Sequence, residues 1–203
     1  MADTRTSFLT AAGAFVDQVA RIPLSALTGP GLGDWDLRSL VGHTSRSLVT
    51  VETYLDQPAP EVAVPTAADY YVAIASALGA GGAEIVERGR LAGLALGDEP
   101  ATFVHDLAAR VRDRLGNYDA TYVLTTIAGG MRLDEYLRTR TFELVVHGLD
   151  LERACGVAPA FGTDALIDAA TLAAEVAVLT GRGPDLLLAL TGRAGLPDGL
   201  SVV

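Results

Sequence analysis

The chain has 203 residues, of which 50% are hydrophobic and 20% are charged, so it has enough apolar material for one packed domain built from small and aliphatic side chains. Its formal net charge is -10 and no basic stripe offsets it, which argues against nucleic acid or an anionic membrane surface as a partner. Cys155 is the only cysteine, so the chain cannot form an internal disulfide. No continuous apolar segment approaches the roughly 20 residues that span a bilayer. We therefore expect a cytoplasmic protein.

Apolar residues at helical spacing, together with the positions of proline and glycine, predict a mainly α protein. The predicted helices cover residues 4–22, 36–55, 66–89, 99–115, 133–154 and 163–180. Asp36 is placed to cap the second helix, with Trp35 packing on Leu40 as a hydrophobic staple. Thr66 is the expected cap of the third helix, and the glycines at 79–82 mark a point where that helix can break.

Two segments depart from the helical pattern. Residues 121–127 are rich in β-branched side chains and are followed by two glycines, which predicts a short strand or an ordered loop. Residues 184–203 combine a short leucine-rich run with several glycines and are too few to form a domain. We therefore expect a helical bundle over residues 1–158, followed over residues 159–203 by a helix and a short extension with minor α/β structure.

Two histidines and a glutamate are candidates for a metal site. His147 lies four residues after Glu143 in a strong predicted helix, so the two side chains share one face, one turn apart. Zinc accepts imidazole nitrogen and carboxylate oxygen at about 2.0 to 2.2 Å. His43 lies on a narrow polar stripe of the second predicted helix, where a buried polar group needs a partner. Spacing alone leaves two alternatives open: a metal site, or a solvated helix pair with a separate core histidine.

Other residues near these candidates have two interpretations each. Arg140 and Asp150 share a helical face with the two candidate ligands of their helix, either to support the ligands or bind substrate, or as a surface ladder of salt bridges. The third histidine, His105, lies among charged residues and is expected at the surface, and Cys155 is expected to fill space. The sequence has no phosphate-binding loop, nucleophile elbow or Cys-x-x-Cys pair.

Three segments resemble a known family. Residues 35–43, WDLRSLVGH, are similar to the tryptophan-to-histidine helix start of the DinB-like metal-binding bundles. Residues 137–154, LRTRTFELVVHGLDLERA, resemble the second signature of one branch of those bundles, the mycothiol-dependent maleylpyruvate isomerase family. Residues 190–202, LTGRAGLPDGLSV, are similar to the tails of this branch. The resemblance implies a DinB-like up-and-down four-helix bundle.

The resemblance also implies a metal site and its chemistry. The metal ligands of the family are a histidine, a glutamate and a second histidine, which match His43, Glu143 and His147. We expect a divalent ion, with zinc preferred, whose open position takes a thiol and presents it as a thiolate. In the family that thiol is mycothiol, the low-molecular-weight thiol of actinobacteria, which adds to an unsaturated diacid and permits isomerisation.

The expected activity is metal-dependent and mycothiol-dependent isomerisation or S-transfer on a small electrophile. Full-length members, as the resemblance implies, carry a larger C-terminal α/β domain that helps to shape the substrate pocket. Only about 20 to 40 residues follow the last bundle helix here, fewer than a domain needs, so the electrophile is left open rather than named as maleylpyruvate. The alternatives are a non-catalytic metal-binding bundle that serves as a sensor or partner-binding module and, more weakly, a zinc hydrolase.

Overall fold

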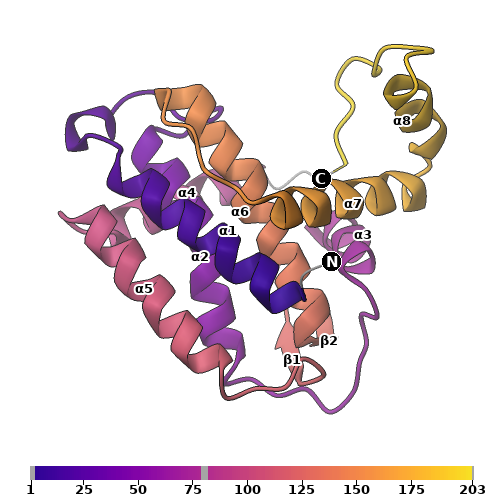
Figure 1. Ribbon diagram of the computed structural model, residues 1–203, viewed down its shortest axis with the longest axis horizontal. Coiled ribbons are helices and arrows are strands. Elements are labelled where there is room, and N and C mark those ends of the chain that lie inside the picture. The colour runs from indigo at the N-terminus through magenta and orange to yellow at the C-terminus, as the bar shows by residue number, and fades with distance from the viewer. Residues whose placement is uncertain (1–2, 79–81, 203) are drawn as a thin grey trace.

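The structure, a computed structural model, describes residues 3–78 and 82–202 (Figure 1). In chain order its elements are α1 (Thr4–Ala20), the short 3-10 helix η1 (Leu24–Ala26), α2 (Leu37–Tyr54), α3 (Ala67–Leu78), α4 (Gly82–Ala95), α5 (Pro100–Leu115), β1 (Val123–Thr126), β2 (Gly129–Arg132), α6 (Leu133–Cys155), α7 (Thr163–Leu179) and α8 (Gly183–Leu190). The predicted mainly α fold is confirmed. The predicted break in the third helix falls mostly on residues 79–81, which lie outside the described residues.

Local signals in the sequence place the ends of several helices. The Asp36 carboxylate accepts the backbone N–H of Ser39 at 2.7 Å and so caps α2. The Thr66 hydroxyl accepts the backbone N–H of Asp69 at 3.1 Å and caps α3 in the same way. The long helix α6 ends at Gly156, whose positive φ of 74° is a left-handed conformation that glycine adopts without strain. Each cap agrees with its sequence prediction.

Helices α1, α2, α5 and α6 form the bundle. Each of α1 and α2 packs against both α5 and α6. Arg5, at the start of α1, donates to the carbonyl of Tyr118 just after α5 ends, whereas Arg38, at the start of α2, donates to the carbonyl of Gly97 just before α5 begins. Helix α1 is therefore antiparallel to α5, and α2 is parallel to α5. The chain reverses direction between α5 and α6, so α1 and α6 run in one direction and α2 and α5 in the other, as Figure 1 shows. The predicted four-helix bundle is confirmed, but the directions of its helices are up, down, down and up instead of the expected up-and-down alternation.

The segment between α2 and α5 makes this order of directions possible. Helices α3 and α4 carry the chain back along the bundle, so that α5 starts at the same end as α2. Helix α4 packs against α2, and α3 packs against α6 and α7. The approach of α4 to α2 is close, because a Cβ atom at Gly42 would lie 2.2 Å from the backbone nitrogen of Gly93. Helix α4 of this crossover segment, which comprises α3 and α4, is thus packed directly against α2, the helix that carries His43.

A β-hairpin joins α5 to α6. Strands β1 and β2 pair antiparallel, with Val123 opposite Arg132. The extended prediction for residues 121–127 is confirmed by β1. Strand β2 was not predicted, because its two glycines have low strand propensity. Gly130 is needed there by a tertiary contact, since a Cβ atom would lie 2.0 Å from the carbonyl oxygen of Glu61.

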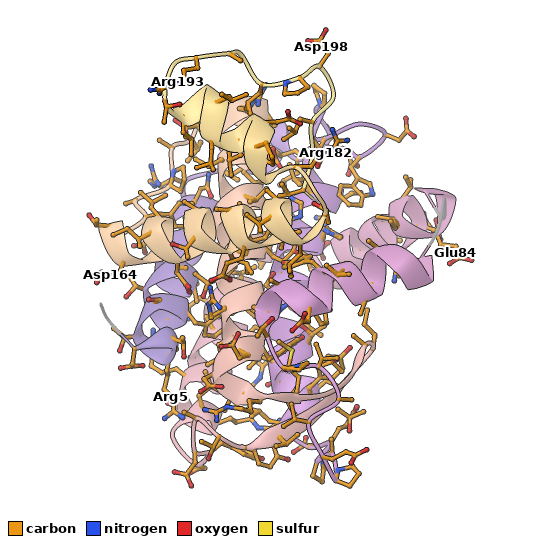
Figure 2. The ribbon with its side chains drawn as sticks, turned by 90° about the vertical axis from the view of Figure 1, so that its right-hand side faces the viewer. Arg5, Glu84, Asp164, Arg182, Arg193 and Asp198 are labelled. Carbon is orange, nitrogen blue, oxygen red and sulfur yellow. The ribbon has the colours of Figure 1, made fainter. Side chains whose placement is uncertain are left out.

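The C-terminal region, residues 159–202, is helical. Helix α7 packs against α1, α3 and α6, and α8 packs against α7. Within the described residues this region holds no strand, so the minor β-structure of the fold is the hairpin between α5 and α6. Figure 2 places Arg193 and Asp198 of the tail at the end of the molecule farthest from Arg5. No helix in the described part of the chain is long and apolar enough to cross a bilayer.

Candidate metal centre

The three predicted ligands come together between α2 and α6. One ligand atom each from His43, Glu143 and His147 lies within 4.8 Å of the other two. Nε2 of His147 is 3.2 Å from Oε2 of Glu143, as expected for residues one turn apart on α6. The ring of His43, which α2 supplies, is 4.9 Å from the ring of His147 and nearly perpendicular to it, at 83°. Residues about 100 positions apart in the chain thus become neighbours because α2 and α6 pack face to face.

His43 lies on α2 in a partly buried position, beside Trp35 and α4. Its ring packs on Trp35 with centroids 4.4 Å apart, and the indole N–H of Trp35 donates to the carbonyl of Val86 at 2.9 Å. Within the described residues, Nδ1 of His43 is buried and has no hydrogen-bond partner. Burial, reinforced by the charge of His147, lowers the pKa of His43 to about 4. The imidazole is therefore neutral at pH 7, which is the form that binds a metal.

His147 has a carboxylate at each ring nitrogen. Its Nδ1 is 3.0 Å from Oδ2 of Asp150, and its Nε2 faces Glu143. Burial alone would lower the pKa of His147, but the two carboxylates, with Asp150 first, raise it to about 9. A metal ion would take the place of the proton on Nε2, while Asp150 keeps the N–H on Nδ1 and so fixes the ring orientation.

Glu143 is an ionised carboxylate with a different partner on each oxygen. Oε1 accepts the hydroxyl hydrogen of Tyr71 at 2.7 Å, and Oε2 faces His147. Burial alone would raise the pKa of Glu143, but the hydrogen bond from His147 and the nearby charge of Arg140 lower it to about 2. Tyr71 was not predicted as a site residue. It lies 72 positions before Glu143, and no spacing in the sequence links the two.

Arg140 and Asp150, the two supporting candidates, have separate roles. The Arg140 guanidinium carbon lies 5.0 Å from the ring centroid of Tyr136 and 5.6 Å from that of Tyr70, in cation–π geometry. Its Nε donates to the hydroxyl of Thr139 at 3.0 Å. Along this face Glu143 pairs with His147 at 3.2 Å and His147 with Asp150 at 3.0 Å, whereas no ion pair of Arg140 occurs among the described residues, so the ladder of ion pairs includes Asp150 and excludes Arg140. Arg140 points into the bundle, whereas Asp150 contacts His147.

A cavity of about 160 Å³ adjoins His43 and Glu143. Three arginines line it, Arg46 from α2, Arg88 from α4 and Arg140 from α6, and Glu143 is the one acidic residue among its lining residues within the described chain. Neither Arg46 nor Arg88 forms an ion pair in the part of the chain that the structure describes. The cavity is therefore cationic although the chain as a whole is acidic. Arg46 could have been found from the sequence, because it lies three residues after His43 on the same helical face.

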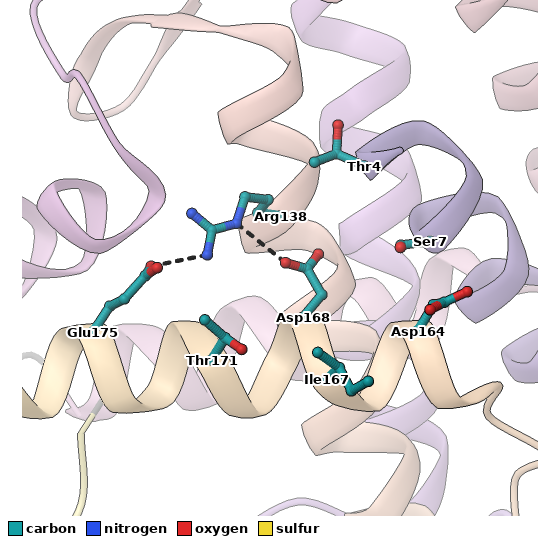
Figure 3. A pocket seen from close by; sticks show the side chains of 8 residues that line it. All are labelled: Thr4, Ser7, Arg138, Asp164, Ile167, Asp168, Thr171 and Glu175. Carbon is teal, nitrogen blue, oxygen red and sulfur yellow. Dashed lines mark hydrogen bonds and ion pairs between the residues drawn. The ribbon is translucent and has the colours of Figure 1, made fainter. Parts of the chain in front are cut away.

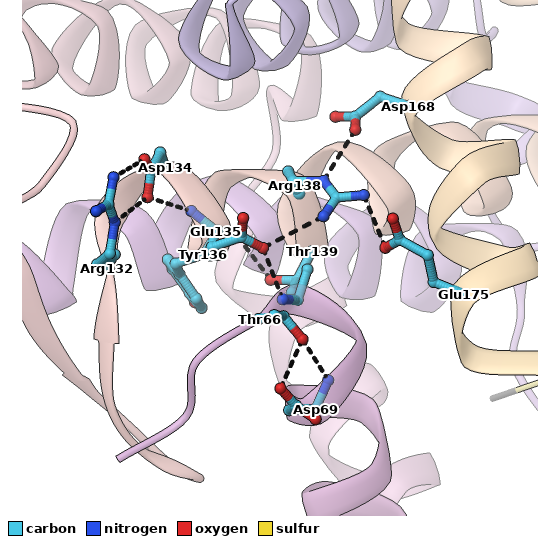
Figure 4. A network of polar contacts seen from close by, with 11 residues as sticks. Thr66, Asp69, Arg132, Asp134, Glu135, Tyr136, Arg138, Thr139, Asp168 and Glu175 are labelled. Carbon is cyan, nitrogen blue, oxygen red and sulfur yellow. Dashed lines mark hydrogen bonds and ion pairs between the residues drawn. The ribbon is translucent and has the colours of Figure 1, made fainter. Parts of the chain in front are cut away.

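A second cluster of charges lies at the junction of α3, α6 and α7 (Figures 3 and 4). Arg138 of α6 donates to Asp168 at 3.1 Å, to Glu175 at 2.9 Å and to Glu135 at 3.3 Å. Glu135 also accepts the backbone N–H of Ala67 at 2.8 Å, which attaches the start of α3 to α6. The adjoining cavity of about 290 Å³ is lined by Arg138 and by two of its partners, Asp168 and Glu175. We interpret the cluster as the contact that positions α3 and α7 on α6.

The remaining candidates lie outside the metal centre. His105 is exposed and pairs with Asp106 at 3.1 Å, as expected for a surface histidine. Cys155 is half-buried at the end of α6, where its thiol donates to the carbonyl of Leu151 at 3.1 Å. Neither residue is a member of the candidate metal group.

Comparison with known families agrees with this geometry. Residues 8–152, more than half of the chain, match the family described as the mycothiol maleylpyruvate isomerase N-terminal domain. The matched span contains His43, Glu143 and His147, together with all the crossover and hairpin residues between them. No curated protein and no solved structure matches the chain. The chain therefore belongs to the mycothiol maleylpyruvate isomerase N-terminal domain family.

Proposed function

We propose that the chain binds one divalent metal ion, with zinc preferred, through His43, Glu143 and His147. Two imidazoles and one carboxylate are donors that zinc accepts, and their atoms lie within 4.8 Å of one another. Tetrahedral bonds of about 2.0 to 2.2 Å place ligand atoms roughly 3.4 Å apart, so the longest of these separations would have to shorten by up to roughly 1.4 Å. Nδ1 of His43 is buried without a hydrogen-bond partner among the described residues, and a metal ion is one partner that would offset the cost of burying it.

Three protein ligands leave one coordination position open, which is the pattern of catalytic rather than structural zinc sites. When bound, the ion would supply Lewis acidity that lowers the pKa of a thiol at that position. Membership of the family supports mycothiol as that thiol. The contribution of the chain is to keep Nε2 of His147 and Oε2 of Glu143 directed at one point, with Asp150 holding the other imidazole nitrogen.

The observation that supports an anionic substrate is the cationic cavity beside the proposed ligands. Arg46 and Arg88 have no acidic partner among the described residues, so a small anionic electrophile would find two free guanidinium groups there. Arg140, fixed by two tyrosine rings, adds a third positive charge. The cavity is smaller than the roughly 300 to 1,000 Å³ of typical ligand pockets, so it suits a small electrophile and the reacting end of a thiol.

We infer an isomerase or S-transferase that uses mycothiol on a small anionic electrophile. The test is a panel of unsaturated carboxylates and their neutral methyl esters, assayed with mycothiol, with glutathione and without thiol. We expect turnover of the carboxylates with mycothiol, a large loss in Glu143→Gln, and weaker turnover of the esters. Arg46→Gln should raise KM for the carboxylates and leave KM for the esters unchanged, since only the carboxylates use its charge.

Two results would redirect the proposal. Turnover that does not depend on a thiol would indicate metal-assisted hydrolysis instead. No turnover of any electrophile, together with no thiol-induced change in the absorption of cobalt-substituted protein, would indicate a metal-binding module without catalytic activity.

A further inference from the structure

The Glu143 carboxylate, one of the three ligands proposed above, is held from outside the four-helix bundle. Its Oε1 accepts the hydroxyl hydrogen of Tyr71, which belongs to the crossover helix α3. We propose that Tyr71 is a positioning residue that reserves Oε1 for this hydrogen bond and so presents Glu143 to the ion through Oε2 alone. The inference rests on the proposed metal site and adds to it the number of oxygens that Glu143 supplies.

The hydrogen of Tyr71 has a defined acceptor. The Tyr71 oxygen lies 2.7 Å from Oε1 of Glu143 and 3.2 Å from the carbonyl oxygen of Thr139. A phenol has one hydrogen to donate, and a charged carboxylate at the shorter distance is the stronger acceptor. Oε1 is therefore occupied, whereas Oε2 faces Nε2 of His147 at 3.2 Å, on the side where the ion would lie.

The Tyr71 side chain cannot turn away easily. It is 4% exposed, and its ring packs on Phe142 of α6 with centroids 5.3 Å apart. The backbone of α3 is attached one turn earlier, where the N–H of Ala67 donates to Glu135 at 2.8 Å. Phe142 and Glu135, the partners of the Tyr71 ring and of the Ala67 N–H, both lie on α6. Helix α3 therefore holds the Tyr71 hydroxyl at a constant position relative to Glu143.

A carboxylate that uses one oxygen occupies one coordination position, and one that uses both occupies two. Tyr71 thus determines whether a small ion such as zinc keeps an open position beside its three ligands. The proposed chemistry needs that position for the thiol. Substitution of Tyr71 should therefore change both the affinity for the ion and its coordination number.

The first experiment compares Tyr71→Phe with wild type in a zinc titration against a chelator and in the absorption spectrum of the cobalt-loaded protein. Partners that orient a metal ligand typically contribute 10- to 100-fold in affinity, so we expect a loss of roughly that size. We also expect weaker cobalt absorption bands, because the bands lose intensity as the coordination number rises. The control is Tyr122→Phe, which removes a tyrosine hydrogen bond of 3.1 Å to the carbonyl of Leu55, away from the metal ligands.

The control should keep wild-type affinity and the wild-type spectrum, since the hydrogen bond that it loses does not involve the proposed metal ligands. Wild-type affinity and an unchanged cobalt spectrum in Tyr71→Phe would overturn the role of Tyr71 while leaving the metal site intact. Absence of metal binding by wild-type protein would overturn the metal site itself, and the role of Tyr71 with it.

A second measurement leaves Tyr71 unchanged and covers the case in which Tyr71→Phe does not fold. The infrared difference spectrum between metal-free and zinc-loaded wild type reports how a carboxylate binds, because the symmetric and antisymmetric stretches move apart for one-oxygen coordination and together for two-oxygen coordination. We expect the stretches of Glu143, identified by their loss in Glu143→Gln, to move apart. Movement together would overturn the proposal.

Discussion

At the scale of single residues, the candidate site places a histidine between two carboxylates, and binding of a metal ion would change the protonation of that histidine. His147 lies between two carboxylates that raise its pKa to about 9, whereas burial keeps His43 neutral. In the metal-free protein at pH 7, His147 thus carries a proton on Nε2 that an incoming ion must displace. Protons and metal ions compete for one nitrogen.

This competition predicts how zinc affinity depends on pH. Because the pKa of His147 in the metal-free protein is raised to about 9, binding releases one proton at any pH below that value. Affinity should therefore increase about tenfold for each pH unit between pH 7 and 9 and level off above pH 9. The measurement is a chelator-competition titration at several pH values.

Two variants check the cause of that pH dependence. In Asp150→Asn the main group that raises the pKa is lost, so the affinity should level off at a lower pH. Glu152→Gln, which removes a carboxylate two residues along the same helix, should behave like wild type. An affinity for zinc that is constant from pH 7 to 9 in wild type would contradict the proton competition.

At the scale of elements, the site depends on the close packing of α4 against α2. Gly42 precedes His43, one of the proposed ligands, and a Cβ atom at Gly42 would lie 2.2 Å from the backbone of Gly93. Backbone atoms cannot move aside as the end of a flexible side chain can. The same contact places Val86 over Trp35 and Arg88 beside the cavity.

Gly42→Ala should therefore lower the free energy of unfolding by about 1–3 kcal/mol or more, the usual cost of overpacking. It should also weaken zinc binding, since separating the two helices displaces His43. Gly13→Ala is the matched control: apart from its chain neighbours and the backbone of its own helix, no atom of the described residues lies within 4 Å of a Cβ at Gly13 in the middle of α1. That change should stabilise the protein by about 0.5–1 kcal/mol, because alanine favours helix. Urea unfolding measures both, and equal stability of the two variants would contradict the role of the contact.

At the scale of the whole molecule, the bundle has a core that does not include the proposed metal ligands. One cluster of buried apolar side chains extends through all four bundle helices, and fully buried members include Phe8, Phe15, Leu48 and Leu107. His43, Glu143 and His147 lie at the edge of this cluster and are only partly buried. Such a core can hold the fold without the ion.

Removing the metal should thus leave a folded bundle of lower stability. At free zinc of 100 times the dissociation constant, binding adds about 2.7 kcal/mol to the free energy of unfolding. Thermal unfolding with and without a chelator measures the difference, and it should vanish in His147→Ala. Trp35 is the only tryptophan and lies 4.4 Å from His43, so its fluorescence should be quenched when cobalt binds. A metal-free protein that is unfolded would instead assign the ion a structural role.

Local interactions in the sequence determined by themselves where several helices begin and end, and which two residues of α6 share the candidate site. The caps at Asp36 and Thr66 and the stop at Gly156 involve neighbours three or four residues away, and so does the pairing of Glu143 with His147. Helical periodicity acts over the same short range. These features could be predicted because their partners lie within one turn of helix.

Only the tertiary structure decided which distant residues join the site. Tyr71 reaches Glu143 across 72 positions, and Arg88 reaches the cavity because α4 lies on α2. Strand β2 likewise exists where a glycine permits close approach of the segment before α3. Such contacts depend on which helix faces pack together and in which direction each helix runs. That choice is made by burial of the whole core, a sum over many side chains that no short stretch of sequence contains.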